Sequence, residues 1–361
     1  MPLGALPSWV SSLPLWRWYE LPNTALSSVD PVPRPMGFTG PSSKIDAWCG
    51  ATLRRAGSVY LIGAAGGHAD YAGNEVDALA LNVATPAWVQ LRAPTPDSAV
   101  LDRAQFYLDN RPAATHSYYA TQYIDRLDRM MVFSSAGLTG LGTAAPANYP
   151  YTSSIGRSFS FNYQARDWDA PDYVAQFPGI GDSIACLCVK HPVTGDVYLS
   201  RNSGDGWYRW TAALNTWRRL PGFARAPWYG GAAIDPRRQR MLVVGSYSPI
   251  RPAVYDLTGG SIAVTFRGLG EGPLGQLIGY PGVVYEEVLD RFLVFYNTDS
   301  GVKMYAVDAA TWTVEEPLVT GVAPVRRTNG VLNAVQFVPE LRGVVFANKH
   351  NGNVHFMRTS S

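Results

Sequence analysis

The strongest constraint on the fold is a short pattern that recurs along the 361-residue chain. Each copy is a tight turn rich in Asp, Gly and Arg, followed directly by an apolar strand. Successive strands begin 44 to 71 residues apart. Their first residues are Val59, Met130, Val197, Met241, Phe292 and Val344. Repeats of about 40–50 residues with four short strands each are typical of β-propeller blades.

The stretch 59–91 shows the repeating unit most completely. An apolar strand runs into Gly66 and Gly67, then into a polar loop and an alternating strand, and the unit ends at Trp88-Val-Gln-Leu91. Paired glycines permit positive φ and a close approach of neighbouring strands. The pattern resembles the blades of kelch and galactose-oxidase-like propellers, and this resemblance implies a fold more directly than an activity.

A second signature indicates how the ring closes. Strands of the form Trp-x-x-Leu end the first and third repeats, but the last repeat stops near Arg358 without one. Trp18–Pro22 supplies such a strand at the other end of the chain. An N-terminal strand in the last blade would remove the exposed edges of an open array.

We therefore predict an all-β chain that forms a single six-bladed kelch-like propeller over residues 1–361. The expected blades are 41–92, 113–175, 183–222, 229–267, 280–319, and 331–358 plus 15–22. A seven-bladed ring is the alternative, although no seventh copy of the turn and strand is found. The two long intervals contain insertions at 93–112 and 137–151, and 98–108 is predicted to form a short helix.

Composition and charge exclude several classes of protein. The chain is 47% hydrophobic with 35 Gly and 27 Pro, which suits many short strands joined by turns. A formal net charge of +2 without a basic stripe gives no reason to expect nucleic acid. No apolar stretch is long enough for membrane insertion. The N-terminus lacks the basic and apolar regions of a signal peptide, so synthesis in the cytoplasm is expected. Cys49, Cys186 and Cys188 are expected to be free thiols.

One face of the ring is the expected binding surface. In each blade, the loop after the second strand and the loop that leads into the next blade open on the same side, around the central channel. Arg forks bind carboxylates, sulfates and phosphates, and aromatic planes suit sugars, so an anionic glycan is favoured and a protein partner is the other option. The predicted ligand-binding residues are His68, Asp70, Tyr71, Arg111, His116, Arg201, Trp228, Tyr229, Arg251, Tyr280, Arg326, Arg327 and His350.

The densest group of chemically active side chains lies in the first two repeats. His68, Asp70 and His116 could hold a divalent metal, although no cofactor is expected. Tyr71, Arg111 and His116 are the candidate catalytic residues. The structural alternative is that His68 and Asp70 order their loop by hydrogen bonds and that His116 caps a strand.

Two related propeller families imply specific chemistry. The galactose-oxidase resemblance implies a copper site with a Tyr-His pair, but this chain has no Tyr-His dipeptide, so a copper radical oxidase is not predicted. The chain also resembles propeller polysaccharide lyases, which use Tyr, His and Arg to neutralise a uronate and abstract its C5 proton. No lyase motif matches residue by residue.

Two functions follow as hypotheses. The first is a non-catalytic binding module for a glycan or a protein. It resembles kelch-like proteins of bacteriophage tails and bacterial genomes, which implies virion association, a receptor-binding or structural role, and assembly into a larger complex. The second is a carbohydrate-active enzyme, a lyase that acts on an acidic glycan. The sequence favours the first.

Overall fold

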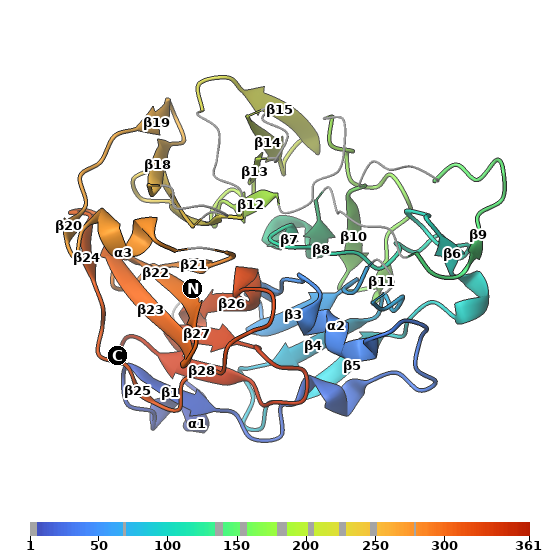
Figure 1. Cartoon of the computed structure of the whole chain (residues 1–361), viewed down its shortest axis with the longest axis horizontal. Helices are drawn as coiled ribbons and strands as arrows, with labels where there is room; N and C mark the ends of the chain where they lie inside the picture. The colour runs from blue at the N-terminus through green and yellow to red at the C-terminus, as the bar shows by residue number, and fades with distance from the viewer. Residues whose placement is uncertain are drawn as a thin grey trace.

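The protein forms a ring of β-sheets around one axis (Figure 1). The structure is a computed structural model, and it describes residues 6–67, 70–133, 140–151, 157–178, 186–200, 206–223, 229–245, 251–277 and 279–361. Within these residues, six sheets each contain four antiparallel strands. In five sheets the strands follow chain order outward from the axis, and in the sixth the outermost of the four is the first strand of the chain. The all-β, six-bladed ring that the repeats predict is therefore confirmed.

The blades are numbered here in chain order. Blades 1 and 2 are β2 (Thr52–Arg54), β3 (Val59–Gly63), β4 (Val76–Ala80) and β5 (Trp88–Arg92), then β7 (Thr121–Ile124), β8 (Arg129–Val132), β10 (Phe159–Asn162) and β11 (Asp167–Trp168). Blades 3 and 4 are β12 (Leu187–Lys190), β13 (Val197–Ser200), β14 (Trp207–Thr211) and β15 (Thr216–Leu220), then β16 (Gly231–Asp235), β17 (Arg240–Val244), β18 (Ala253–Asp256) and β19 (Gly260–Ile262).

Blades 5 and 6 each gain a short parallel strand at the outer edge. Blade 5 is β21 (Gly282–Glu286), β22 (Arg291–Thr298), β23 (Gly301–Asp308) and β24 (Thr313–Glu315), with β20 (Arg267–Gly268) beside β24. Blade 6 is β26 (Val335–Val338), β27 (Gly343–Phe346), β28 (His355–Arg358) and β1 (Arg17–Glu20), with β25 (Thr320–Gly321) beside β1.

The core consists of apolar layers between adjacent blades. Side chains alternate along a strand, so one strand can serve two layers. In β3, Leu61 packs in the layer that contains Met130 of blade 2, whereas Tyr60 packs in the layer that contains Phe356 of blade 6. This two-sided burial explains why all five residues of β3 are buried and why the strand reads as an unbroken apolar run.

The recurring turn connects the innermost strand of each blade to the second. In five blades, the residue immediately before the second strand is a non-glycine residue in the left-handed region, with φ between 49° and 57°. These residues are Ser58, Asp128, Gln239, Asp290 and Arg342. Gly195 has φ 75° in the corresponding turn of blade 3. A type I turn that ends in a left-handed residue is a common short hairpin connection, so the turn fixes the strand register.

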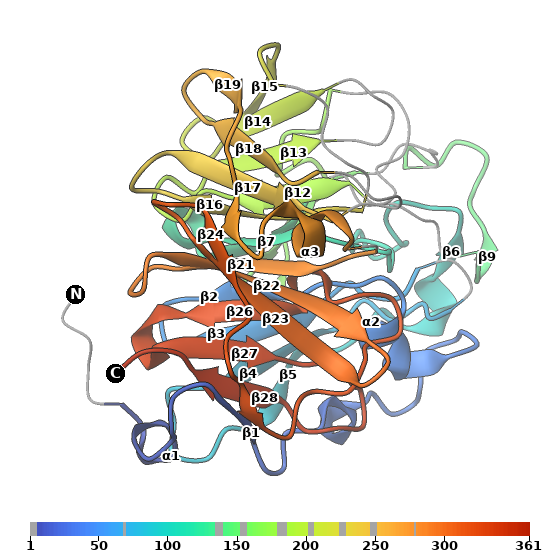
Figure 2. The same cartoon turned by 60° about the vertical axis from the view of Figure 1, so that its left-hand side comes forward.

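The N-terminal strand closes the ring as predicted. β1 runs antiparallel to β28, with Trp18 opposite Met357 and Glu20 opposite His355. Figure 2 shows β1 beside β28 at the rim of the ring. The last blade therefore contains both the first and the last strand of the described chain, and its inner strands are not left with an open outer edge.

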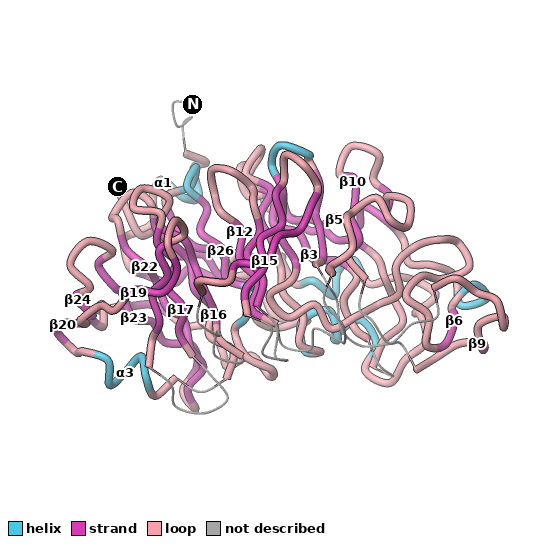
Figure 3. Tube along the Cα trace, turned by 90° about the horizontal axis from the view of Figure 1, so that it is seen from above, coloured by secondary structure: helices cyan, strands magenta, loops and turns pink. Residues whose placement is uncertain are grey.

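The first insertion differs from the prediction. The prediction of a helix over 98–108 is wrong. In this stretch the chain forms the 3₁₀ turn η3 (Asp97–Ala99), followed by β6 (Leu101–Asp102). β6 pairs in parallel with β9 (Thr143–Ala144) of the second insertion, and Leu101 is buried in a small apolar cluster of its own. This tertiary pairing outweighs the local helix preference. The two strands stand apart from the ring (Figure 3).

Helices in the part of the chain that the structure describes are short, with at most five residues each. Besides η3, they are α1 (Ser8–Ser11), α2 (Ser43–Asp46), α3 (Glu271–Gly275), and the 3₁₀ turns η1 (Leu26–Val29), η2 (Gly40–Ser42), η4 (Asp125–Leu127), η5 (Leu332–Ala334) and η6 (Pro339–Leu341). Among the described residues, none of these helices is long and apolar enough to cross a membrane.

Candidate functional site

The candidate site lies at one end of the central channel. The innermost strands surround a cavity of about 160 Å³. Its lining includes Tyr119 and Asn333 and extends to Arg55, Lys190 and Glu287 at the recurring turns. The recurring turns lie at one end of these strands. The loops that lead into the strands therefore lie at the other end, which is the face that the sequence predicts for binding.

A continuous row of rings occupies this loop end. The ring centroids of Tyr229 and Tyr280 are 4.8 Å apart, and those of Tyr280 and Tyr118 are 5.7 Å apart. His116 lies 6.2 Å from Tyr118 and 5.1 Å from Trp48. We call these five residues the mouth cluster. Trp48, Tyr229 and Tyr280 are partly exposed, whereas His116 and Tyr118 are buried.

The repeat itself positions the mouth cluster. Trp48 precedes β2, Tyr118 precedes β7, Tyr229 precedes β16 and Tyr280 precedes β21, so four blades each contribute one ring. The N–H of Tyr118 also donates to the carbonyl of Trp48 at 2.8 Å, which holds two of these segments together.

Three of these rings have an unusual backbone conformation. Trp48, Tyr118 and Tyr229 have φ of 53°, 46° and 62°. Bulky residues seldom adopt this left-handed region, and such strained positions cluster at functional sites. Outside the mouth cluster, Trp16 and Trp312 share this conformation.

Asp70 joins the mouth cluster from the β3–β4 loop. Its Oδ2 lies 3.2 Å from Nε2 of His116, and about a third of its side chain is exposed. The paired glycines permit this contact, because a Cβ on Gly67 would lie 2.8 Å from the backbone nitrogen of His116. The predicted close approach at these glycines is therefore observed.

Tyr71 faces the interior rather than the channel. It is fully buried, and its hydroxyl donates to Oε1 of Glu75 at 2.6 Å. Burial, together with the neighbouring Glu75, raises the pKa of Tyr71 well above its ordinary value. Its phenol is therefore a neutral hydrogen-bond donor within the fold.

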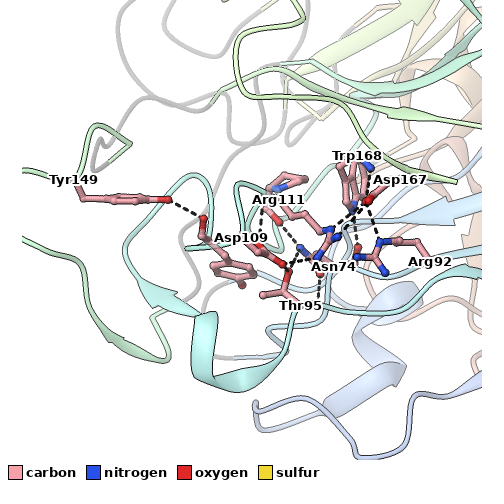
Figure 4. A network of polar contacts seen from close by, with 10 residues as sticks. Asn74, Arg92, Thr95, Asp109, Arg111, Tyr149, Asp167 and Trp168 are labelled. Carbon is pink, nitrogen blue, oxygen red and sulfur yellow. Dashed lines mark hydrogen bonds and ion pairs between the residues drawn. The ribbon is translucent and has the colours of Figure 1, made fainter. Parts of the chain in front are cut away.

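Arg111 belongs to a polar network on the flank of blades 1 and 2 (Figure 4). Its guanidinium forms a fork with Asp167, at 3.0 Å and 3.2 Å, and donates to Asp109 at 2.7 Å. Arg92 reaches Asp167 as well, at 2.9 Å. Burial raises the pKa of Asp109, which also accepts a bond from Thr95. The fork that the sequence assigns to an anionic ligand is thus occupied by two carboxylates.

Arg327 is also engaged inside the protein. It is 1% exposed, and its guanidinium donates to the carbonyls of Gly330, Val331, Ile45 and Cys49. Its neighbour Arg326 is exposed and lies 3.3 Å from Asp299. The two consecutive arginines therefore differ in environment: Arg327 holds a loop to the segment before β2, and Arg326 faces solvent.

Of the remaining predicted residues, the structure describes His350 and Arg251. Nε2 of His350 lies 2.8 Å from Oδ1 of Asp30, which is not a residue of the mouth cluster. Arg251 is exposed just before β18. His68, Arg201 and Trp228 lie outside the described residues.

The ligand and metal assignments of these residues stay predictions. Among the described residues, no group of three His, Cys, Asp or Glu side chains could hold a metal ion. The predicted metal set includes His68, which the structure does not describe. The predicted binding residues omit Trp48 and Tyr118, although both lie just before an innermost strand, as Tyr229 does.

The comparisons with known proteins concern the fold. No protein-family model matches the chain, and no curated protein matches it either. A structural genomics protein of unknown function from Bacteroides thetaiotaomicron VPI-5482 has a TM-score of 0.51 at 9% identity, over 94% of this chain and 74% of that chain. TolB from Acinetobacter baumannii has a TM-score of 0.45 at 11% identity, over 80% and 58%. The first similarity supports the overall fold alone, which the strand topology identifies as a six-bladed β-propeller.

Proposed function

We propose that the protein is a non-catalytic binding module whose mouth cluster receives the sugar rings of a glycan. The observation that carries the proposal is the continuous row of five rings, drawn from four blades, at one end of the channel. Aromatic side chains supply a large apolar surface with a polar tip, which matches a sugar with its apolar faces and hydroxyl rim.

The charges at the site favour a neutral, hydroxyl-rich glycan. Asp70 presents a partly exposed carboxylate that can accept hydrogen bonds from sugar hydroxyls. Arg111 and Arg327, which could recognise an acidic sugar, are engaged by Asp109, Asp167 and backbone carbonyls. An acidic glycan would therefore have to displace partners that are already well placed.

The lyase hypothesis has less support. Its candidate catalytic residues are Tyr71, Arg111 and His116, but Tyr71 is buried against Glu75 and Arg111 is held by two carboxylates. A general base must lie within hydrogen-bond reach of the proton that it removes.

A receptor-binding role on a virion, implied by the kelch resemblance, would use the same loop face and the same glycan chemistry.

An array of immobilised neutral and acidic oligosaccharides tests the proposal. Wild-type protein is expected to bind neutral oligosaccharides. Tyr229→Ala should weaken the binding about tenfold, because truncating an aromatic anchor typically costs more than about 1 kcal/mol. Tyr305→Ala is the matched control, since Tyr305 stacks on Tyr296 in blade 5 at 4.9 Å, away from the mouth cluster. If Tyr229→Ala still bound neutral oligosaccharides and Tyr305→Ala did not, the assignment of the glycan site to the mouth cluster would be contradicted.

A further inference from the structure

A second chemical centre lies inside blade 1, under the short helix α2. Nζ of Lys44, on α2, lies 2.8 Å from Oδ2 of Asp77 on β4 and 3.2 Å from Oε1 of Glu75. The exposed fractions of the three side chains are 1% for Lys44 and 0% for each acid. Asp30 is the next carboxylate, at 3.6 Å, and it is 29% exposed. A lysine thus lies in contact with two carboxyl groups in a solvent-excluded position.

The hydrogen bonding of this group is incomplete. Oδ1 of Asp77 and Oε2 of Glu75 are buried and have no hydrogen-bond partner among the described residues. A buried charge is costly unless its polar atoms are satisfied, and breaking such a pair typically leaves a large penalty. These unsatisfied oxygens reduce what the ion pair can contribute to stability, so stabilisation alone does not explain the arrangement.

Local structure holds the reacting atoms in place. The β4–β5 pairing shifts register between Val76 and Asp77, and bulges of this kind re-aim side chains. The hydroxyl of Tyr71 donates to Oε1 of Glu75 at 2.6 Å and fixes that carboxyl. Gly73 permits the packing, because a Cβ there would lie 2.4 Å from Oε2 of Glu75.

We propose that Lys44 and Asp77 condense to an intramolecular amide bond, with Glu75 as the proton shuttle. Nζ of Lys44 attacks Cγ of Asp77, a C–N bond forms, and one C–O bond of the carboxyl group breaks. Glu75 transfers two protons, one after the other, from the nitrogen to the departing oxygen, which leaves as water. An ammonium and a carboxylate become one amide and one water, so no further reactant is needed.

Burial favours this reaction. It raises the pKa of Asp77 to about 7, so the carboxyl is readily protonated. Burial alone would lower the pKa of Lys44, but Asp77 and Glu75 outweigh it and raise that pKa, so the amine needs Glu75 to accept its proton. Fixed contact between the reacting groups supplies the high effective concentration of an intramolecular reaction. The amide also removes two buried charges and one unsatisfied oxygen.

The bond would link two parts of the chain that meet near the ring closure. Lys44 lies in the segment that leads from β1 of blade 6 to blade 1, and Asp77 lies in the third strand of blade 1. In Figure 1, α2 lies against blade 1. The cross-link would anchor this connecting segment independently of the hydrogen bonds between β1 and β28.

Mass spectrometry of denatured protein tests the bond. After correction for the substitution itself, wild-type protein should weigh one water less than Lys44→Arg. A tryptic digest should contain residues 18–54, uncleaved at Lys44, joined to residues 56–92. Fragmentation should place the link at Asp77. Separate peptides from wild-type protein kept folded at neutral pH would overturn the proposal, as would a link to Glu75 or Asp30.

Two further variants test the mechanism. Asp77→Asn should form the same amide and lose ammonia instead of water. Glu75→Gln should retain its full mass while a cooperative thermal transition shows that it is folded. A folded Glu75→Gln protein that still forms the bond would exclude Glu75 as the shuttle. The wild-type peptide map decides the existence of the bond even where a variant does not fold.

Discussion

Trp18 in β1 lies directly opposite Met357 in β28, so residues near the two ends of the chain pair in one blade. Trp18 is only 6% exposed, and its ring lies 6.2 Å from Phe295 of blade 5 and 6.2 Å from His355. The strand therefore contributes both ladder hydrogen bonds and apolar packing to the joint between blades 5 and 6.

Deleting residues 1–24 should destabilise the ring. The deletion exposes the edge of β28 and the apolar layer that Trp18 covers, and exposed edges promote association. Size-exclusion chromatography and thermal denaturation should show aggregation or a large fall in Tm. A monomer that melts at the parental temperature would contradict closure by β1.

Trp18→Ala should reproduce most of the effect of that deletion. Truncating a buried Trp typically costs about 3–5 kcal/mol. Leu15→Ala is the control, because Leu15 is 42% exposed and lies just before the strand. Urea denaturation should show a large loss of unfolding free energy for the first variant only. Equal effects of the two variants would mean that Trp18 has no special place in the joint.

The consecutive residues Arg326 and Arg327 should differ in how much they contribute to thermal stability. Arg327→Ala leaves buried carbonyls without donors, each at a cost of about 1–3 kcal/mol, so its Tm should fall markedly. Arg326→Ala should leave the Tm nearly unchanged, because exposed ion pairs contribute little. Differential scanning calorimetry provides the comparison. A larger loss for Arg326→Ala would contradict the assigned environments.

Asp290 should contribute stability that depends on pH. Its hydrogen bonds with Arg238 lower the pKa of the carboxyl from 3.8 to about 2. A lowered pKa gives stability that is fully present above the unfolded value and is lost as the pH falls through the folded value. The difference in unfolding free energy between wild type and Asp290→Asn should therefore shrink between about pH 4 and about pH 2. Urea denaturation at several pH values measures it.

The control for this titration is Asp299→Asn, since Asp299 is fully exposed beside Arg326. The difference in unfolding free energy between wild type and Asp299→Asn should stay small at every pH. A constant difference for Asp290→Asn down to about pH 2 would show that the ion pair with Arg238 does not lower the pKa.

The three cysteines should react slowly in the folded protein. Cys49, Cys186 and Cys188 are buried and form no disulfide, and burial raises the pKa of Cys49 to about 11. The thiolate is the reactive form, so labelling should be slow until the protein unfolds. Denatured, unreduced protein should titrate as three thiols. A lower count would show that a disulfide forms.

The ring could be predicted because its signals are local and repeated. The left-handed turn residue and the apolar strand after it mark each blade, and the Trp-x-x-Leu strand near Trp18 marks the closure. The prediction of a helix over 98–108 was wrong because the structure of this stretch depends on a contact that is distant in sequence. The pairing of Leu101 with Thr143 depends on a second insertion, which no local window contains.

The positions of the candidate residues in the fold were predictable, but their hydrogen-bond partners were not. Tyr229, Tyr280 and His116 lie at the loop end of the blades, where topology places them. The partners of Arg327 could not be foreseen, because the carbonyls of Ile45 and Cys49 lie 282 and 278 residues away. Local sequence does not reveal whether an arginine on a loop faces solvent or a ring of carbonyls.

Isothermal titration calorimetry with the neutral oligosaccharide that binds best on the array tests the central claim most directly. If the mouth cluster stacks on sugar rings, Tyr280→Ala should raise the Kd about tenfold or more, whereas Tyr280→Phe should retain most of the affinity because its ring remains. Tyr305→Ala should bind like wild type. A Kd for Tyr280→Ala equal to that of wild type would contradict the claim that the mouth cluster is the glycan site.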